Sequence, residues 1–222
     1  MTKSKQENSS PWLSQAEQKE DRRRKREALL HASAAAFSKK GFHATSLSDV
    51  ATSLGISKPT IYHYFPKKED ILYEVASEAL EKIQVAIDKA EGADGIERLR
   101  HLLIVYAKSL TVDYGKCVVR TSDTDLSEDG RVKLAARKRE IDVTIRRAIE
   151  DAIADGTVRD CDVRIATFVV TGALNWIAQW HQPDGRLSPE EVAETCTDIL
   201  LGGLENHGVA ITPNAGSENG GR

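Results

Sequence analysis

The sequence has few cysteines and no long apolar run. Cys117, Cys161 and Cys196 are an odd number, lie far apart and form no Cys-x-x-Cys pair, which argues against a disulfide framework and fits a reducing compartment. No uninterrupted apolar segment is long enough to span a bilayer, and the polar N-terminus does not resemble a signal peptide. We therefore expect a cytoplasmic protein with no membrane partner.

Motifs for common catalytic chemistry are also missing. The sequence contains no Gly-rich phosphate loop, no G-x-S-x-G elbow and no H-E-x-x-H pair, and its six histidines show no i, i+4 pairing. Asp123, Asp125 and Asp129 share a polar loop, but the twelve-residue spacing of a calcium loop is absent. The sequence predicts a protein that is not an enzyme and needs no metal or cofactor.

Charge is divided unevenly along the 222 residues. The net charge is −3 overall, but residues 1–68 carry +7 and the remainder carries −10. A basic first third on an acidic body localises a footprint for nucleic acid to the N-terminal part. Hydrophobic residues make up 40% of the chain, which is enough to bury a core in one large or two small domains.

The stretch over residues 45–69 has the densest set of helix signals. Ser46 is a good N-cap, with Asp49 placed to complete a capping box, and apolar residues then repeat at helical spacing. Gly55 stands where this helix must stop, because glycine accepts a left-handed cap conformation. Ser57 then caps a second helix. Two short helices joined by a tight glycine turn predict a helix-turn-helix, whose second helix fits a DNA major groove.

The second helix of this pair combines a small apolar face with polar and aromatic groups that suit DNA. Ile61 and Phe65, four residues apart, are expected to face the core, while hydroxyl and ammonium groups suit phosphates and base edges. The free N–H groups at the start of the following helix, with two lysines, form a natural phosphate clamp. The expected DNA-binding residues are Thr45, Ser46, Ser57, Lys58, Pro59, Thr60, Tyr62, His63, Lys67 and Lys68.

A basic run, Arg22-Arg23-Arg24-Lys25-Arg26, lies in the helix expected over residues 21–40. It could contact phosphates or a minor groove, as basic arms do. It could equally be a solvated face that pairs with Glu20, Asp21 and Glu27. The sequence leaves both interpretations open.

The region from Phe37 to Leu72 resembles the DNA-binding domain of the TetR family of transcriptional regulators. The residues that carry the resemblance are Phe37, Gly41, Phe42, Thr45, Ser46, Val50, Ala51, Gly55, Ile56, Ser57, Thr60, Ile61, Tyr62, Tyr64, Phe65, Lys68, Glu69 and Leu72. Two positions depart from the pattern. Lys67 replaces a helix-capping residue, and Pro59 stands where many members have Gly, Arg or Ala, so base preference does not transfer.

Helical periodicity continues through the rest of the chain. We expect an all-α fold with a disordered arm (1–18), a three-helix helix-turn-helix domain (19–66), a helical ligand-binding and dimerisation domain (67–204) and a flexible tail (205–222). Helices are predicted over residues 67–90, 96–113, 131–155, 165–180 and 189–204, with a shorter apolar piece at 116–120. Residues 121–130 are predicted to form a polar loop.

The last two helices have apolar faces to spare, which predicts a homodimer packed as a four-helix bundle. The resemblance supports this, since TetR-like proteins usually dimerise through their last two long helices, and a two-fold dimer reads a palindrome in double-stranded DNA. It also implies a small-molecule effector that lowers operator affinity. The expected ligand-binding residues are Leu102, Leu103, Tyr106, Leu110, Val118, Phe168, Asn175, Trp176 and Gln179.

The stretch from Trp180 to Glu191 is similar to the matching part of TetR-family regulators of fatty-acid and steroid degradation, which implies an acyl-CoA thioester as effector. Basic residues on one face of the predicted helix at 131–155 could hold an anionic ligand such as coenzyme A phosphates, or pair with neighbouring acidic residues. The function expected is thus a ligand-released repressor. The alternatives are a constitutive or architectural DNA-binding dimer, a repressor answering to a different hydrophobic ligand, and a metabolic enzyme or ligand-binding protein with an incidental helix-turn-helix.

Overall fold

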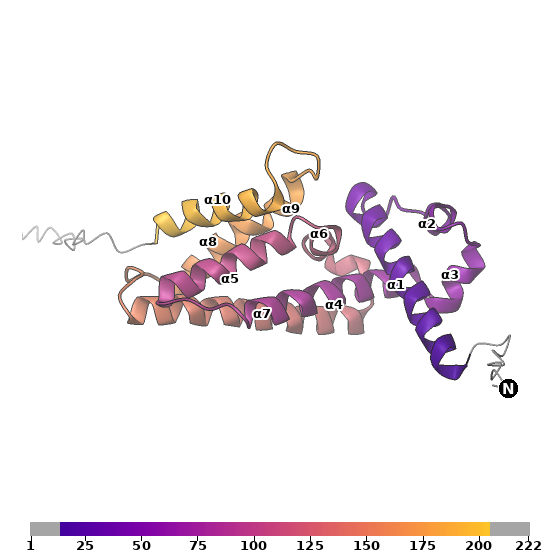
Figure 1. The fold of residues 1–222 in the computed structure, drawn as a ribbon, viewed down its shortest axis with the longest axis horizontal. Helices are drawn as coiled ribbons and strands as arrows, with labels where there is room; N and C mark the ends of the chain where they lie inside the picture. The colour runs from indigo at the N-terminus through magenta and orange to yellow at the C-terminus, as the bar shows by residue number, and fades with distance from the viewer. Residues whose placement is uncertain (1–13, 205–222) are drawn as a thin grey trace, which may run out of the picture.

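A computed structural model describes residues 14–204, and the regular elements in that range are helices (Figure 1). All but one are α-helical, the exception being a single 3₁₀ turn, η1. In chain order they are α1 (Gln15–Lys40), α2 (Leu47–Ser53), α3 (Lys58–Tyr64), α4 (Lys68–Ile87), α5 (Gly95–Ser109), α6 (Asp113–Arg120), η1 (Asp123–Asp125), α7 (Glu128–Ala154), α8 (Val163–Asn175), α9 (Ile177–Trp180) and α10 (Pro189–Gly202). The all-α fold class is confirmed.

Helices α1 to α3 gather at one end of the elongated molecule, on the right of Figure 1. Their shared core contains Leu30, Phe37, Val50, Ile61 and Phe65, each no more than 3% exposed. Burial of such side chains contributes on the order of 1.5–3 kcal/mol each. The prediction that Ile61 and Phe65 face inward is therefore confirmed.

Helix α1 begins earlier than the sequence suggested. The Ser14 hydroxyl accepts a hydrogen bond from the Glu17 N–H, and the Glu17 carboxylate accepts one from the Ser14 N–H at 2.7 Å. This capping box satisfies N–H groups that would otherwise lack partners at the helix start. The predicted arm is thus wrong for residues 14–18, which belong to the cap and first turn of α1; residues 1–13 and the predicted tail at 205–222 lie outside the described residues.

Helix α4 joins the small N-terminal domain to the larger helical body. Its 20 residues at about 1.5 Å each span about 30 Å. It packs against α1 at one end and against α5, α6 and α7 along its length. A buried stripe from Ile71 to Ile87 makes these contacts. One continuous rod thus links the helix-turn-helix to the interior of the body.

Within the body, α5 packs against α10 on one side and against α7 and α4 on another. The short helix α6 contacts α1, α4 and α9, so it lies where the two parts of the molecule meet (Figure 1). Helix α8 packs mainly against α7. Leu99, Leu103, Ile145 and Ile149 are fully buried where these helices converge.

Two predicted boundaries in the body are wrong. The loop expected at residues 121–130 contains η1 and the start of α7, which is capped by Ser127. The single helix expected over 165–180 is divided at Trp176, so that α8 ends at Asn175 and the short α9 follows. At the break the Gln179 N–H donates to the Trp176 carbonyl, three residues back, at 2.9 Å.

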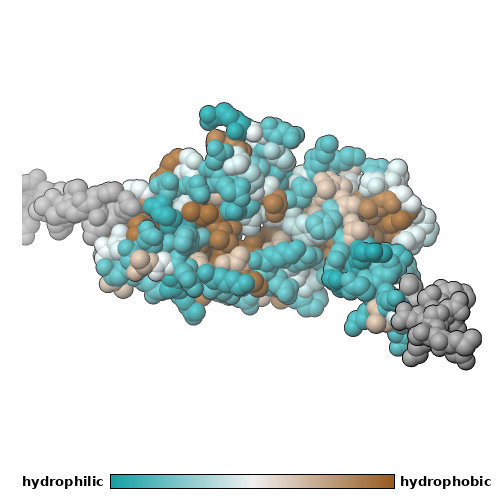
Figure 2. All heavy atoms as spheres, in the orientation of Figure 1, coloured by the Kyte–Doolittle hydropathy of each residue, from teal (hydrophilic) through white to brown (hydrophobic). Residues whose placement is uncertain are grey.

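The surface is largely hydrophilic, with hydrophobic residues in patches on both the C-terminal body and the N-terminal domain in the view of Figure 2. Between residues 14 and 204 no helix is both long and apolar enough to cross a membrane. In the same range no cluster of three or more His, Cys, Asp or Glu side chains is arranged to hold a metal ion.

Candidate DNA interface and ligand cavity

The turn between α2 and α3 is tight because Gly55 adopts a left-handed conformation, with φ at +64°. The Ile56 N–H then donates to the Ala51 carbonyl at 3.0 Å, closing the end of α2 as a glycine C-cap does. The Ser57 hydroxyl accepts from the Thr60 N–H and lies 2.8 Å from the Thr60 hydroxyl. These local bonds fix the angle at which α3 leaves the turn.

Ser46 caps α2, but not through the predicted capping box. Its hydroxyl accepts from the Ser48 N–H at 3.1 Å. The Asp49 carboxylate, which has a shorter reach than Glu, pairs with Lys40 of α1 at 3.1 Å instead. The capping box at Ser46 is therefore wrong, while Ser46 as the N-cap is confirmed.

Helix α3 turns its polar and aromatic side chains to solvent. Lys58, Pro59, Thr60, Tyr62 and His63 are all exposed. The Lys58 ammonium lies 5.9 Å from the centre of the Tyr62 ring, and the Tyr62 side chain is 44% exposed. An ammonium, hydroxyls and an imidazole on one exposed helix face can donate to phosphates and to base edges.

Two of the predicted DNA-binding residues use their side chains to bind main-chain carbonyls of the same domain. Thr45 is 3% exposed, and its hydroxyl lies within hydrogen-bonding distance of the carbonyls of Ala36 and Gly41, so its side chain is unavailable to DNA and that prediction is wrong. The Lys68 ammonium donates to the Phe42 carbonyl and lies 4.3 Å from the centre of the Phe42 ring. Burial lowers the pKa of Lys68. Lys67, by contrast, is exposed at the N-terminus of α4.

Four members of the basic run in α1 are engaged in ion pairs. Arg23 pairs with Glu20 and Glu27, and Arg24 and Lys25 both pair with Asp21. Arg26 pairs with Glu74 of α4 at 2.9 Å and lies 5.0 Å from the centre of the Phe65 ring. The run is thus mainly a paired helix face, with Arg22 exposed beside it.

A cavity of about 350 Å³ opens in the body between α4, α5, α6, α7 and α8. Such a volume lies at the small end of the range of about 300–1,000 Å³ typical of ligand cavities. Aliphatic side chains make most of its wall. The lining residues are Leu80, Ile83, Tyr106, Leu110, Val118, Val119, Lys138, Ile141, Asp142, Ile145, Phe168, Thr171 and Asn175.

Five of the nine residues predicted for ligand binding line this cavity, namely Tyr106, Leu110, Val118, Phe168 and Asn175. Leu102 and Leu103 do not, since they are 1% and 0% exposed and pack inside the core. Trp176 and Gln179 do not either, and both are exposed. These four residues are therefore not part of the cavity wall.

The α7 wall, with Lys138, Ile141, Asp142 and Ile145, was absent from the predicted site. Ile141 and Ile145 lie on the apolar stripe recognised in the sequence at residues 131–155. Their four-residue spacing marks a buried face, but it does not distinguish core from cavity.

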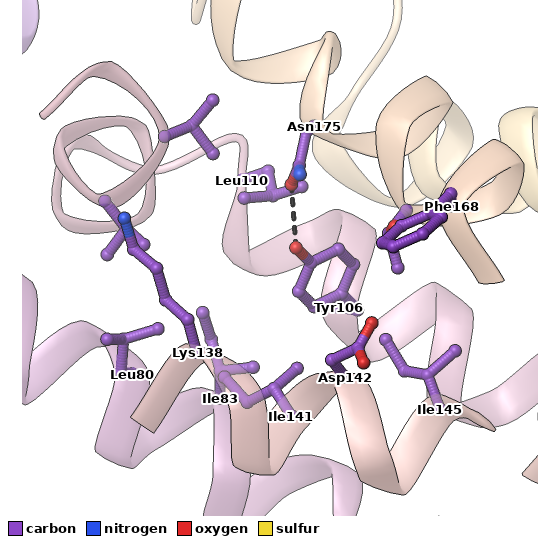
Figure 3. A pocket seen from close by; sticks show the side chains of 13 residues that line it. Leu80, Ile83, Tyr106, Leu110, Lys138, Ile141, Asp142, Ile145, Phe168 and Asn175 are labelled. Atoms are coloured by element: carbon purple, nitrogen blue, oxygen red, sulfur yellow. Dashed lines mark hydrogen bonds between the residues drawn. The ribbon is translucent and has the colours of Figure 1, made fainter. Parts of the chain in front are cut away.

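The polar residues of the cavity wall are Tyr106, Lys138, Asp142, Thr171 and Asn175. In Figure 3 Tyr106 and Asn175 meet near the middle of the view, and Lys138 extends along the other side. The Tyr106 hydroxyl donates to the Asn175 side-chain oxygen at 2.7 Å, joining α5 to α8. Burial raises the pKa of Tyr106 to about 12, so the phenol is neutral at physiological pH. Asp142 lies at the cavity and pairs with Arg146 at 2.8 Å.

Helix α6 ties the body to the N-terminal domain through main-chain acceptors. The Arg120 guanidinium donates to the Ser38 carbonyl of α1 and to the Ala178 carbonyl of α9, the latter at 2.6 Å. Near the other end of α6, the buried Lys116 ammonium donates to the His181 carbonyl at 3.1 Å. A displacement of α9 or α6 would therefore also move the end of α1 to which Arg120 is bonded.

A second apolar surface lies on the outer side of α8 and α10. Ile165 and Val169 of α8, Trp176 directly after it and Ile199 of α10 are each between 58% and 72% exposed. Ile165 and Val169 line a hollow of about 360 Å³ between the two helices. Clustered exposed side chains of this size are typical of a surface that another protein covers.

In a comparison with known proteins, a family model matches each of the two parts of the molecule. A family model described as bacterial regulatory proteins of the tetR family matches residues 29–75. A second, described as a tetracyclin repressor-like C-terminal domain, matches residues 92–204. Together they span the helix-turn-helix and most of the body.

Similar full-length proteins are also regulators. The transcriptional repressor KstR2 of Mycolicibacterium smegmatis is 28% identical over 193 residues, covering 81% of this chain and 90% of the repressor. The structure of PfmR, a TetR family transcriptional regulator from Thermus thermophilus, is 36% identical with a TM-score of 0.72, covering 80% of this chain and 98% of that one.

The structure of AibR in complex with isovaleryl coenzyme A and operator DNA is 23% identical with a TM-score of 0.68. The match covers 78% of this chain and 96% of that one. On the family models and the similarity to PfmR, the chain belongs to the TetR family and is a DNA-binding transcriptional repressor.

Proposed function

We propose that this repressor binds a palindromic operator as a homodimer and is released from it by an acyl-CoA thioester that enters the cavity between α4 and α8. The cavity itself carries the proposal: its wall is mainly aliphatic with several polar groups, and it includes the same helix α4 whose first turn adjoins the helix-turn-helix.

The proposed DNA contacts come from α2, α3 and the start of α4. Solvent exposure of the α3 side chains and the net charge of +7 over residues 1–68 support them. A surface of this sign attracts the phosphate backbone, while hydroxyls and amide groups fix register. The residues proposed are Ser46, Ser57, Lys58, Pro59, Thr60, Tyr62, His63 and Lys67.

The proposed dimer forms through the apolar outer face of α8 and α10. A single helix-turn-helix reads one half-site, so two copies related by a two-fold axis are needed for a palindrome. Placing a carboxylate in this face, as in Val169→Glu, should yield monomers by light scattering. A Val132→Glu control on exposed α7 surface should stay dimeric.

The effector assignment rests on cavity chemistry together with the similarity to AibR, whose solved complex contains isovaleryl coenzyme A. To act, the ligand must bind the form with DNA-incompetent spacing more tightly than the operator-bound form. A preference of about 100-fold supplies about 2.7 kcal/mol of coupling. Helix α4 is the physical link, because Leu80 and Ile83 line the cavity and Lys68 begins the helix beside the reading domain.

Calorimetry with isovaleryl-CoA, dodecanoyl-CoA and oleoyl-CoA, paired with binding to a palindrome found beside the protein's own coding region, tests the proposal. We expect at least one thioester to release heat and to weaken operator binding. No heat from any of the three, with operator binding unchanged, would refute acyl-CoA as the effector. Operator binding that no ligand alters would instead favour a constitutive DNA-binding dimer.

Operator binding itself should depend steeply on salt, because each neutralised phosphate releases counterions. Replacing Lys58 by Gln removes one phosphate contact from each subunit of the dimer, so it should lower the slope of log affinity against log salt by about two. Lys89→Gln, which removes a lysine exposed beyond the end of α4, is the matched control and should leave the slope unchanged.

A further inference from the structure

The Tyr106–Asn175 pair is the polar feature in the middle of a largely aliphatic cavity. In Figure 3 the phenol points from α5 toward the end of α8, where the Asn175 side chain meets it. Ile83 and Ile141 lie to one side of the phenol, and Ile145 and Phe168 to the other. A ligand that fills the cavity therefore contacts this pair.

The hydrogen-bonding inventory of the pair is incomplete. The single proton of the Tyr106 hydroxyl goes to the Asn175 oxygen at 2.7 Å. The Asn175 amide nitrogen keeps two N–H donors, and none of the hydrogen bonds within residues 14–204 uses them. The bond from Tyr106 fixes the oxygen of Asn175 toward α5, which sets the direction of the remaining donors. Asn175 is half-buried on the cavity wall, so a ligand that fills the cavity displaces water from these donors, and a donor left without an acceptor is then costly.

We propose that Asn175 determines effector specificity by donating a hydrogen bond to an uncharged carbonyl oxygen of the effector, with Tyr106 as the residue that positions it. This inference rests on the proposed function, and it identifies the ligand group that the cavity distinguishes. A thioester or a ketone satisfies the donor; a hydrocarbon or a thioether of the same shape leaves it unpaired.

The charges around the pair favour a neutral carbonyl over a carboxylate. The donor is an uncharged amide, and the Tyr106 phenol beside it is also neutral. The nearest labelled anion in Figure 3 is Asp142, on the α7 wall below Tyr106, while Lys138 extends along the opposite side of the cavity from Asn175. A carboxylate that met only this uncharged amide and phenol would lose its hydration without gaining a charged partner, which is unfavourable.

A matched set of ligands and variants tests the inference. The ligands are isovaleryl-CoA and dodecanoyl-CoA, each compared with its thioether, S-isopentyl-CoA or S-dodecyl-CoA, which lacks the carbonyl oxygen. The wild-type chain should bind at least one thioester about tenfold or more tightly than its thioether, since an unpaired buried donor costs on the order of one hydrogen bond.

Asn175→Asp keeps an acceptor for the Tyr106 hydroxyl and has no donor in its ionised form, so in that form the preference for thioester should fall to within about twofold. Asn175→Leu removes the donor without adding charge beside Asp142, and it should give the same loss of preference. Tyr106→Phe should reduce the preference partly, because Asn175 keeps its donors but loses its orientation. Tyr73→Phe, outside the cavity, is the control and should keep the full preference.

The outcomes separate the two levels of the proposal. Equal binding of thioester and thioether by the wild type, or an unchanged preference in both Asn175 variants, overturns the specificity role and leaves the acyl-CoA function standing. Failure of every thioester to bind the wild type overturns the acyl-CoA function, and this inference with it. Thermal unfolding of each variant distinguishes a lost donor from a lost fold.

Discussion

Replacing Arg120 by Met should weaken both the stability of the protein and the communication between its two parts. The guanidinium donates to the carbonyls of Ser38 and Ala178 and, at 3.4 Å, to that of Gln179. Hydrogen bonds to charged groups contribute about 1.5–3 kcal/mol each when shielded, but Arg120 is exposed, so solvent screening reduces this. We expect a loss of about 1–2 kcal/mol in the free energy of unfolding.

The same substitution should reduce the response to effector. A 100-fold drop in operator affinity on effector binding corresponds to about 2.7 kcal/mol of coupling. Loss of about 1.4 kcal/mol of that coupling through α6 would leave about a tenfold response. Operator affinity without effector should change less than the response, because Arg120 lies far from α3 in sequence and in the fold.

Urea denaturation and fluorescence anisotropy with labelled operator, each with and without effector, measure the two effects. Arg131→Met is the control, since Arg131 pairs only with Glu128 at 3.3 Å on exposed surface, and such pairs contribute about 0–1 kcal/mol. If Arg120→Met matched this control in stability and also kept the full effector response, the hydrogen bonds of Arg120 would have no role in coupling the two parts of the protein.

Three other predictions follow from local structure. Ile61→Ala, at a fully buried position in α3, should cost about 2–5 kcal/mol and abolish operator binding, measured by urea denaturation and anisotropy. Ser188→Ala removes the hydrogen bond that the Ser188 hydroxyl accepts from the Glu191 N–H in the α10 capping box and should cost about 0.5–2 kcal/mol, whereas Ser188→Asp, which can still cap, should cost less in the same urea assay. Burial and the nearby Lys116 ammonium lower the pKa of His181. Below about pH 6.5 the unfolded chain therefore takes up a proton that the folded chain resists, and stability falls as pH drops; His181→Phe should flatten the decline between pH 7.5 and 5.5, and an unchanged decline would contradict this reading.

Features set by neighbouring residues could be predicted from the sequence. Ser46 and Ser57 cap their helices in the structure as expected, and Gly55 takes the left-handed conformation that ends α2. Each of these bonds is made within a few residues, so residue type and spacing carry the information. The exception, Asp49, pairs with Lys40 nine residues away, a choice that only the packing of α2 on α1 decides.

The cavity could be predicted only in part, because its wall depends on how helices pack. Helix α5 is buried on more than one side, against α10, α7 and α4, so periodicity identifies Leu103 and Tyr106 alike as inward residues and cannot say which faces the hollow. A continuous helix would align Gln179 with Asn175, four residues apart. No Pro or Gly at Trp176 indicates the break in the sequence. The carbonyls of Ala178 and Gln179, just after the break, accept hydrogen bonds from Arg120, which is distant in sequence.

The hydrogen bonds of Arg120 to main-chain oxygens affect which substitutions this chain can accumulate in evolution. Its acceptors are main-chain oxygens at positions 38, 178 and 179, which every amino acid supplies. Substitutions at those three sites can accumulate without loss of the linkage, provided that the helices persist. Position 120 has no such freedom, because lysine offers a single compact charge that cannot reach two helices with a planar fork. Evolutionary constraint on interdomain communication should therefore fall on one residue and spare its partners.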